Sequence, residues 1–188
     1  METEILVEEI IKAIDNIKKC EILDIGTGSG AIAISIAKNS QAKVYAIDVS
    51  KQALDVAKEN AKKNQAKVEF ICSDLFENLK NRKKFDIIAS NPPYIPSADI
   101  EGLDEEVKKY DLRLALDGGK DGLDFYRKII KEAPIHLKKN GLIVFEIGKG
   151  QFSAVKKLLE KNGFFDVQGI KDYNKIYRVV KAKYGNGK

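Results

Sequence analysis

One segment near the amino terminus restricts the fold of this chain more than any other. An apolar run from Glu21 to Ile25 is followed by a turn that contains Gly26, Gly28 and Gly30, and then by an apolar segment from Ala31 to Lys38. The isoleucines of the last segment alternate as in a strand. Its position after a strand and a glycine-rich turn nevertheless favours a helix buried against a sheet. The segment therefore predicts the first half of a βαβ unit.

Strand and helix patterns continue to alternate along the 188 residues. Further strands are predicted at Val44–Ile47, Val68–Cys72, Phe85–Ala89 and Leu142–Ile147. Helices are predicted at Glu2–Lys18, from Ser50 to about Asn64, near Leu123–Ala133, and at Phe152–Lys161 before Asn162-Gly163. Two closing strands, near Phe165–Gly169 and Ile176–Val180, have no helix between them, which predicts an antiparallel hairpin at one sheet edge. The chain is thus predicted to be one α/β domain over residues 1–184, with a disordered tail at 185–188.

Composition narrows the class of protein. Apolar residues make up 44% and charged residues 32% of the chain, as in soluble globular proteins, and no run approaches the roughly 18 apolar residues that a membrane span needs. No signal peptide opens the chain, so a cytoplasmic location is expected. The net charge of +5 comes from lysines spread along the sequence, which indicates a solvated surface and permits a nucleic-acid partner.

The cysteines and the single histidine do not predict a metal site. Cys20 and Cys72 lie in apolar surroundings without the spacing of metal ligands, so both are predicted to be buried free thiols. His136 lies in a segment that reads as a helix end and a turn, which disfavours a catalytic role.

Two aspartates follow predicted strands and are candidates for ligand binding. Asp48, at the end of the second strand, lies about 20 positions beyond the glycine turn, where an acidic residue can accept bonds from ribose hydroxyls. Asp74, just after the third strand, could accept an exocyclic amine of adenine, with Leu75 against the ring. Each acid could instead be a strand-end cap or turn residue. The glycine turn and both acids suit a nicotinamide enzyme as well as a methyltransferase, so another motif must decide.

That motif is Asn91-Pro92-Pro93-Tyr94, directly after the fourth predicted strand. A proline holds its predecessor extended and carries no N–H, so the main-chain carbonyls here need outside donors. The Asn91 side-chain oxygen and the Pro92 carbonyl could accept both hydrogens of a planar –NH2 group, while Tyr94 offers a flat face. This arrangement favours amine or amide methylation over hydride transfer. The alternative is a proline-rich turn that closes a strand.

With these residues the chain resembles the bacterial glutamine methyltransferases that modify peptide chain release factors. The resemblance covers about Glu2 to Tyr184. It rests on Glu2–Val7, the Gly26–Gly30 turn, Asn91–Ile95, Ala115–Leu123, Phe145–Gly148, Lys171-Asp172 and Arg178–Val180. Asn-Pro-Pro-Tyr also occurs in adenine and guanine amine methyltransferases, and the Gly118–Leu123 block narrows the choice.

The resemblance implies a Rossmann-like methyltransferase fold with a seven-stranded, mostly parallel sheet, an antiparallel edge hairpin and helices on both faces. It implies the cofactor S-adenosylmethionine, with S-adenosylhomocysteine as product. The implied cofactor contacts are Gly26, Thr27, Gly28, Ser29, Gly30, Asp48, Asp74, Leu75 and Asn91. The implied acceptor is the glutamine of a release factor's Gly-Gly-Gln loop. Asn91, Pro92, Pro93 and Tyr94 would hold it, and Asn91, Pro92 and Tyr94 would be the catalytic residues.

Three features depart from the family pattern. An amino-terminal helical domain that helps to bind the release factor is expected to be absent. The family's Glu-Pro is replaced by Asp111-Leu112, so the loop from Pro96 to Arg113 is expected to fold differently over the acceptor. Leu75 stands where relatives often have an aromatic residue, which predicts weaker adenine stacking.

Two other functions remain open at this point. Methylation of an exocyclic amine in DNA or RNA fits the motif and the positive charge, and a continuous basic face beside Tyr94 would favour it. A catalytically silent, methyltransferase-like binding scaffold is the second. The intact set of Asp48, Asn91 and Tyr94 argues against a scaffold, which has no need of all three.

Overall fold

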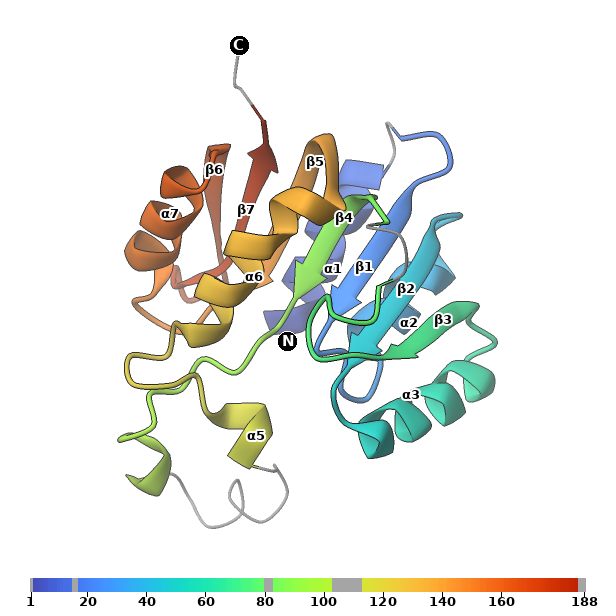
Figure 1. Cartoon of the computed structure of the whole chain (residues 1–188), viewed down its shortest axis with the longest axis horizontal. Coiled ribbons are helices and arrows are strands. Elements are labelled where there is room, and N and C mark those ends of the chain that lie inside the picture. Colours follow the sequence, from blue (N-terminus) through green and yellow to red (C-terminus); the bar gives the residue numbers. More distant parts are fainter. Residues whose placement is uncertain (1, 15–16, 80–82, 103–112, 186–188) are drawn as a thin grey trace.

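The computed structural model describes residues 2–14, 17–79, 83–102 and 113–185 as one mixed sheet between helices (Figure 1). The strand order across the sheet is β3-β2-β1-β4-β5-β7-β6. The strands are β1 (Glu21–Ile25), β2 (Lys43–Asp48), β3 (Val68–Cys72), β4 (Phe85–Ser90), β5 (Leu137–Glu146), β6 (Phe164–Lys171) and β7 (Tyr177–Tyr184). β1 to β5 are parallel, whereas β7 is antiparallel to both β5 and β6. The predicted seven-stranded sheet with its edge hairpin is confirmed.

Helices cover both faces of the sheet, as predicted (Figure 1). The main helices are α1 (Glu2–Ile14), α2 (Ala31–Asn39), α3 (Lys51–Lys63), α6 (Asp124–His136) and α7 (Phe152–Lys161). Two short elements, the 3-10 turn η2 (Ile100–Gly102) and α5 (Arg113–Leu116), lie in the connection between β4 and α6. α1 and α2 bury their apolar faces in one core layer, and α6 and α7 do so in a second layer on the opposite face.

α2 shows how position overrides periodicity. Its alternating isoleucines read as a strand, yet the segment is helical and buries Ile32, Ala33, Ile34 and Ile36. A parallel sheet needs a crossover of a dozen or more residues between neighbouring strands, and β1 and β2 pair in parallel register. The chain must therefore cross the sheet face between them as a helix. The isoleucines of this helix are buried on that face.

The predicted α1 begins at Glu2 as expected but ends earlier than expected. Leu6 and Ile10 of its apolar face are fully buried. The helix, however, ends at Ile14 and not at Lys18, and Lys19 has a positive φ of 55° that a helix cannot continue through. The predicted end at Lys18 is therefore wrong, since Ile17 and Lys18 lie outside the helix.

Strand lengths were also underestimated. β5 begins at Leu137, five positions before the predicted Leu142, because Leu137 pairs with Phe85 on the far side of an irregularity in the ladder. β6 and β7 run to Lys171 and Tyr184, several residues beyond the predicted ends. Antiparallel pairing continues as long as both backbones have partners, whatever the side chains, so the hairpin is longer than its apolar pattern.

The cysteines and His136 lie as follows. Cys20 is buried, and burial raises the pKa of its thiol to about 12. Cys72 is only partly buried, which corrects the prediction for that thiol, because it ends the edge strand β3. His136 is the last residue of α6 and stacks on Phe76 with ring centroids 4.7 Å apart. It leads directly into β5, so the predicted turn after it is wrong.

Two further predictions fall partly or wholly outside the described residues. Asp111-Leu112 and most of the loop around them lie outside, as do residues 186–188 of the predicted tail. Gly185, the first residue of that tail, donates its N–H to the carbonyl of Gly163 at 3.3 Å. Among the described residues, every helix is too short or too polar to cross a bilayer.

The topology creates one special edge of the sheet. The chain passes from β1 outward to β2 and β3 and then returns to β4 on the other side of β1. Connections on the two sides of this point diverge, and in open parallel sheets ligands bind there, beyond the carboxyl ends of the strands. Ile25 pairs with both Ile47 and Ser90, so the loops after β1, β2 and β4 begin at one level.

Candidate functional site

The glycine turn after β1 forms an open cradle at this edge. Gly26, Gly28 and Gly30 have φ values of 67°, 55° and 84°, which side chains disfavour. A Cβ at Gly26 or Gly28 would meet nothing within 4 Å, so these two positions border empty space. A Cβ at Gly30 would lie 3.0 Å from Ile34 Cδ1 and 3.1 Å from the Ala57 methyl. The first two glycines therefore leave room for a ligand, whereas the third lets α2 and α3 approach.

Thr27 and Ser29 point in different directions within this turn. Thr27 is buried, donates its N–H to the Ile47 carbonyl at 3.0 Å, and donates its hydroxyl to Asp24 Oδ2 at 2.6 Å. Ser29 is exposed, and its carbonyl accepts Asn60 Nδ2 at 3.0 Å. Thr27 thus holds the turn from inside. Ser29 is the member of the pair whose side chain faces the surface.

Asp24 belongs to this region, although the sequence analysis did not single it out. It is fully buried, and its second oxygen, Oδ1, makes no hydrogen bond within the part of the chain that the structure describes. Burial raises the pKa of this carboxyl to about 7, against the lowering effects of the Thr27 hydroxyl and the Ala33 backbone N–H. The available signal was an acidic residue inside an apolar strand, directly before the glycines. A buried charge there needs a reason, since its desolvation is costly.

Asp48 connects the glycine turn to the end of β2. Its Oδ2 accepts the Gly28 N–H at 2.9 Å and its Oδ1 accepts the Ser50 N–H at 2.9 Å. Ser50 in turn caps α3 through the Ala53 N–H. A carboxylate has about four lone-pair sites, so these two bonds leave acceptor capacity for a further ligand. The structural role as a turn residue and the predicted role as a ribose acceptor are therefore compatible in the same side chain.

The turn after β3 places Asp74 and Leu75 at the same edge. Asp74 is exposed, and Leu75 has a positive φ of 45°, an uncommon conformation for a branched residue. Ser73 holds this conformation, because its hydroxyl donates to the Leu75 carbonyl at 2.8 Å and accepts the Asn78 N–H at 3.0 Å. Ser73 also donates its N–H to the Asp48 carbonyl at 2.9 Å. The two predicted acid positions are thereby joined through the backbone.

The Asn91–Tyr94 motif begins one residue beyond β4. Ser90 is buried and donates its hydroxyl to the Ile25 carbonyl at 2.8 Å, which fastens the end of β4 to the end of β1. Asn91 therefore follows directly beside the glycine turn. Pro92 is buried, whereas Asn91, Pro93 and Tyr94 are partly exposed. The structure thus brings the predicted acceptor motif and the predicted cofactor turn to one place.

Glu146 borders the motif on its other side and was left without a role by the sequence analysis. Ser90 pairs with Phe145, so Glu146 at the end of β5 comes level with Asn91. Glu146 is buried, and its Oε2 accepts the Thr3 hydroxyl of α1 at 2.9 Å. The amino-terminal helix, which lies far away in the sequence, therefore closes this side of the site.

The segment that follows the motif pairs with the Gly118–Leu123 block. Ile95 forms an isolated parallel bridge with Asp117, and its N–H and carbonyl bond to Leu116 and Gly118 at 3.1 and 2.8 Å. Ser97 donates its N–H to the Gly119 carbonyl at 2.9 Å and its hydroxyl to Asp117 at 2.6 Å. The two sequence blocks that carried the resemblance are therefore one structural unit.

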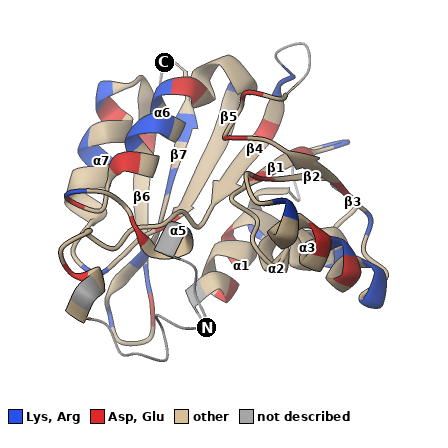
Figure 2. Cartoon of the chain, turned by 60° about the horizontal axis from the view of Figure 1, so that its bottom comes forward, with Lys and Arg blue, Asp and Glu red and all other residues tan. Residues whose placement is uncertain are grey.

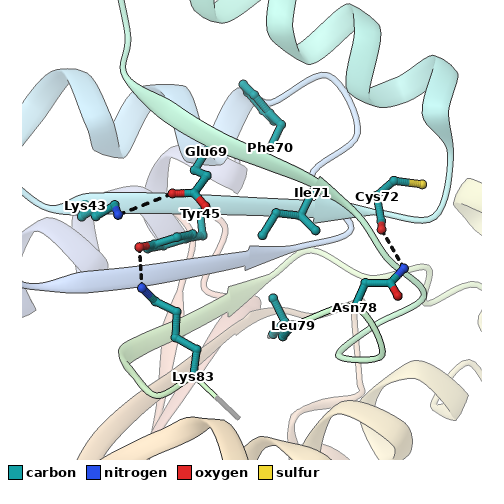
Figure 3. Close-up of a pocket in the computed structure, with 9 residues that line it drawn as sticks. All are labelled: Lys43, Tyr45, Glu69, Phe70, Ile71, Cys72, Asn78, Leu79 and Lys83. Atoms are coloured by element: carbon teal, nitrogen blue, oxygen red, sulfur yellow. Dashed lines mark hydrogen bonds and ion pairs between the residues drawn. The ribbon is translucent and has the colours of Figure 1, made fainter. Parts of the chain in front are cut away.

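A separate pocket of about 490 Å³ is lined by residues of β2 and β3 and by Asn78, Leu79 and Lys83 from the connection between β3 and β4 (Figure 3). Each of its charged side chains has a partner, either within the pocket or beside it. Lys83 lies 4.0 Å from the centre of the Tyr45 ring and 2.8 Å from Glu21, and Lys43 lies 3.5 Å from Glu69. None of the predicted site residues lines this pocket, and each of its charged side chains already has an ion-pair partner.

The surface charge is mixed. Lys and Arg on α3, α6 and α7 are interspersed with Asp and Glu (Figure 2). Arg127 of α6, for example, pairs with both Asp121 and Asp124. On these three helices, within the described residues, positive and negative charges are therefore mixed.

Comparison with known proteins identifies the family. A family described as "Methyltransferase small domain" matches residues 2–106, more than half of the chain. The chain therefore belongs to the methyltransferase small domain family.

Individual relatives point to a narrower group within that family. It is 43% identical over 185 residues to the release factor glutamine methyltransferase of Geobacter sulfurreducens, covering 98% of this chain and 64% of the relative. It is 44% identical over 165 residues to the protein of that name in Bacillus cereus, covering 85% of this chain and 58% of the relative. The resemblance drawn from the motifs is confirmed. The chain spans about three-fifths of the length of these relatives.

The fold also matches solved methyltransferases. The T. thermophilus 16S rRNA N2 G1207 methyltransferase, solved with AdoMet and guanosine, superposes with a TM-score of 0.71 at 21% identity, over 97% of this chain and 43% of that one. At that identity the likeness concerns the fold alone.

Proposed function

We propose that this chain is the catalytic domain of a methyltransferase that uses S-adenosylmethionine to methylate the side-chain amide nitrogen of the glutamine in the Gly-Gly-Gln motif of peptide chain release factors. The observation that supports it most directly is the adjacency of Asn91 to the open glycine cradle, through the Ser90–Ile25 bond. The similarity to relatives named release factor glutamine methyltransferase selects the acceptor.

The residues present fit the cofactor. The two cradle glycines leave empty space where any side chain would intrude, and Asp48 retains acceptor capacity for ribose hydroxyls. Asp74 and Leu75, in the turn that Ser73 joins to Asp48, would take the adenine amine and ring. Asp24, with its unbonded Oδ1, would supply negative charge next to the cationic ligand once its carboxyl is ionised. When bound, S-adenosylmethionine supplies a methyl group on positively charged sulfur, activated for transfer to a nucleophile.

The acceptor motif would align the glutamine amide. Its two N–H groups would bond to the Asn91 side-chain oxygen and the Pro92 carbonyl, and the Tyr94 ring would pack against the amide plane. An amide nitrogen is a poor nucleophile because its lone pair is delocalised. Holding both N–H groups fixes the direction of the lone pair and favours pyramidal nitrogen as the new N–C bond forms.

Proton transfer needs little from the protein. The alkylated amide nitrogen carries positive charge and is strongly acidic, so one N–H proton can leave to water after the methyl has moved. The product is a neutral N-methyl amide. Catalysis would then rest on alignment, and oriented reactants can account for about 7–11 kcal/mol of a barrier. A protein that methylates release factors would be located in the cytoplasm.

Transfer of labelled methyl tests the proposal. The chain is incubated with labelled S-adenosylmethionine and an intact release factor, the same factor with its Gly-Gly-Gln glutamine changed to alanine, or a pool of DNA and RNA. Label on the intact factor alone supports the proposal. Label on nucleic acid, equal label on both factors, or no label despite bound cofactor contradicts it.

A further inference from the structure

Gln151 joins three loops beneath the acceptor motif. It precedes α7, and its side-chain Oε1 accepts the Gly148 N–H at 2.9 Å. Its Nε2 donates to the Tyr94 carbonyl at 3.0 Å and to the Gly122 carbonyl at 3.1 Å. One partly buried amide therefore bonds to the loop after β4, the loop before α6 and the loop after β5.

The glycines around Gln151 are required by close approach of the backbones. A Cβ at Gly118 would lie 2.9 Å from the Pro93 carbonyl oxygen, and one at Gly148 would lie 2.9 Å from Tyr94 Cδ2. A Cβ at Gly122 would overlap the Tyr94 carbonyl oxygen and lie 2.7 Å from Gln151 Nε2. Two loops, the one before α6 and the one after β5, thus pack directly on the Tyr94 segment, and Gln151 bonds to both of them and to the Tyr94 carbonyl.

We infer that Gln151 is the positioning residue of the acceptor site, holding the Tyr94 main chain so that Asn91, Pro92 and the Tyr94 ring are aligned before the acceptor arrives. The inference rests on the proposed function and names a residue outside the acceptor motif. Gln151 donates to Tyr94 through the backbone, so it acts on the reaction through the motif and does not itself touch the acceptor.

The bonding pattern at this position requires a glutamine. The three loops present one N–H and two carbonyls, which need one acceptor and two donors in a single planar group. Glutamate matches the shape but directs a carboxylate at two carbonyl oxygens. Methionine matches the length and volume and leaves all three backbone groups without a side-chain partner. Gln151→Met therefore only removes the three hydrogen bonds, whereas Gln151→Glu also introduces repulsion with the two carbonyl oxygens.

The test compares Gln151→Met and Gln151→Glu with Gln41→Glu, which adds the same charge to an exposed glutamine before β2, at the opposite edge of the sheet. Both Gln151 variants should retain S-adenosylmethionine affinity within about threefold and lose roughly 10- to 100-fold in kcat on the release factor, the scale of a misplaced aligning group. Gln41→Glu should match the wild type in both.

The pH profile gives a readout that a general loss of packing would not move. Once protonated, the carboxyl of Gln151→Glu can donate to one of the two carbonyls, and the repulsion disappears. The ratio of its kcat to that of the wild type should therefore rise as pH falls from about 8.5 to 6, where such a carboxyl gains its proton. The Gln151→Met ratio should stay flat across that range.

A second readout needs no acceptor and so separates this inference from the proposed function. Amide exchange followed by NMR should show faster exchange at Gly148, whose N–H loses its partner, and at Gly118, whose N–H bonds to Ile95. If the wild type fails to methylate release factor, the proposed function is wrong. The exchange rates still test whether Gln151 holds the three loops. Unchanged exchange in both variants, or kcat within about threefold of the wild type, would overturn the inference.

Discussion

Asp48 Oδ2 accepts the N–H of Gly28 at 2.9 Å, which links the carboxyl ends of two neighbouring parallel strands through one hydrogen bond. The bond orients the glycine cradle relative to the acid that would hold the ribose. A ligand that spans both groups meets them already aligned, so little ordering remains to be done on binding.

Asp48→Asn should weaken S-adenosylmethionine binding by roughly 10- to 100-fold, equivalent to about 1.4–2.8 kcal/mol. Asparagine keeps one acceptor oxygen and turns an –NH2 group toward the second backbone N–H, and it lacks the charge. Titration calorimetry measures the change. Asp55→Asn, on the exposed face of α3, is the matched control and should bind normally. A dissociation constant for Asp48→Asn within twofold of the wild type would remove Asp48 from the cofactor site.

Asn91→Ala should leave cofactor affinity within several-fold but lower turnover by at least about a hundredfold, because a contact that aligns the transition state is lost. Calorimetry and single-turnover methyl transfer check the two halves. Asn39→Ala removes an exposed amide at the end of α2 and should leave both values unchanged. Turnover of Asn91→Ala near that of the wild type would show that Asn91 does not align the acceptor.

Asp24 should make the cofactor-free protein less stable as pH rises from about 4 to about 7. The folded-state pKa of about 7 lies above the ordinary 3.8, so in this window the folded state holds a proton that the unfolded state has lost. The stability that the protonated carboxyl contributes therefore decreases through this window and is fully lost only above pH 7.

Asp24→Asn should abolish that dependence and raise the Tm at pH 8 by roughly 3 °C or more, the shift expected for about 1 kcal/mol in a domain of this size. The same variant should bind S-adenosylmethionine more weakly, since the buried negative charge is gone. Thermal melts at pH 5 and pH 8, with and without cofactor, measure both effects. A variant whose Tm falls equally at the two pH values would contradict this account.

Gly26→Ala and Gly30→Ala should fail in different ways. The Cβ at Gly30 meets Ile34 and Ala57 at 3.0 and 3.1 Å, in addition to its strained φ, so we expect a loss of about 1–3 kcal/mol in the free energy of unfolding. The Cβ at Gly26 enters open space, so stability should fall by only about 1 kcal/mol. Cofactor affinity should fall mainly in Gly26→Ala. Urea unfolding measures the stability of the two variants, and calorimetry measures their cofactor affinity. A larger loss of affinity in Gly30→Ala than in Gly26→Ala would mean that the cradle lies elsewhere.

Much of the fold could be read from local pattern. The order of strands and helices, the edge hairpin and the helical state of Ala31–Lys38 followed from the sequence, because a parallel sheet restricts what can lie between its strands. The start of β5 could not be read, because the pairing of Leu137 with Phe85 sets it. The end of α1 was also wrong, since its apolar pattern continues beyond the helix.

The candidate site divides in the same way. The sequence by itself determined that Gly26, Asp48 and Asn91 follow strands that end at one edge, since that depends only on their positions after apolar runs. Only the tertiary structure decided that Asp24 is buried beneath the turn with its Oδ1 unbonded, that Glu146 comes level with Asn91, and that Gln151 bonds to Tyr94. The physical reason is that these roles arise from hydrogen bonds and close backbone contacts between segments far apart in the chain. No local period or spacing encodes such contacts.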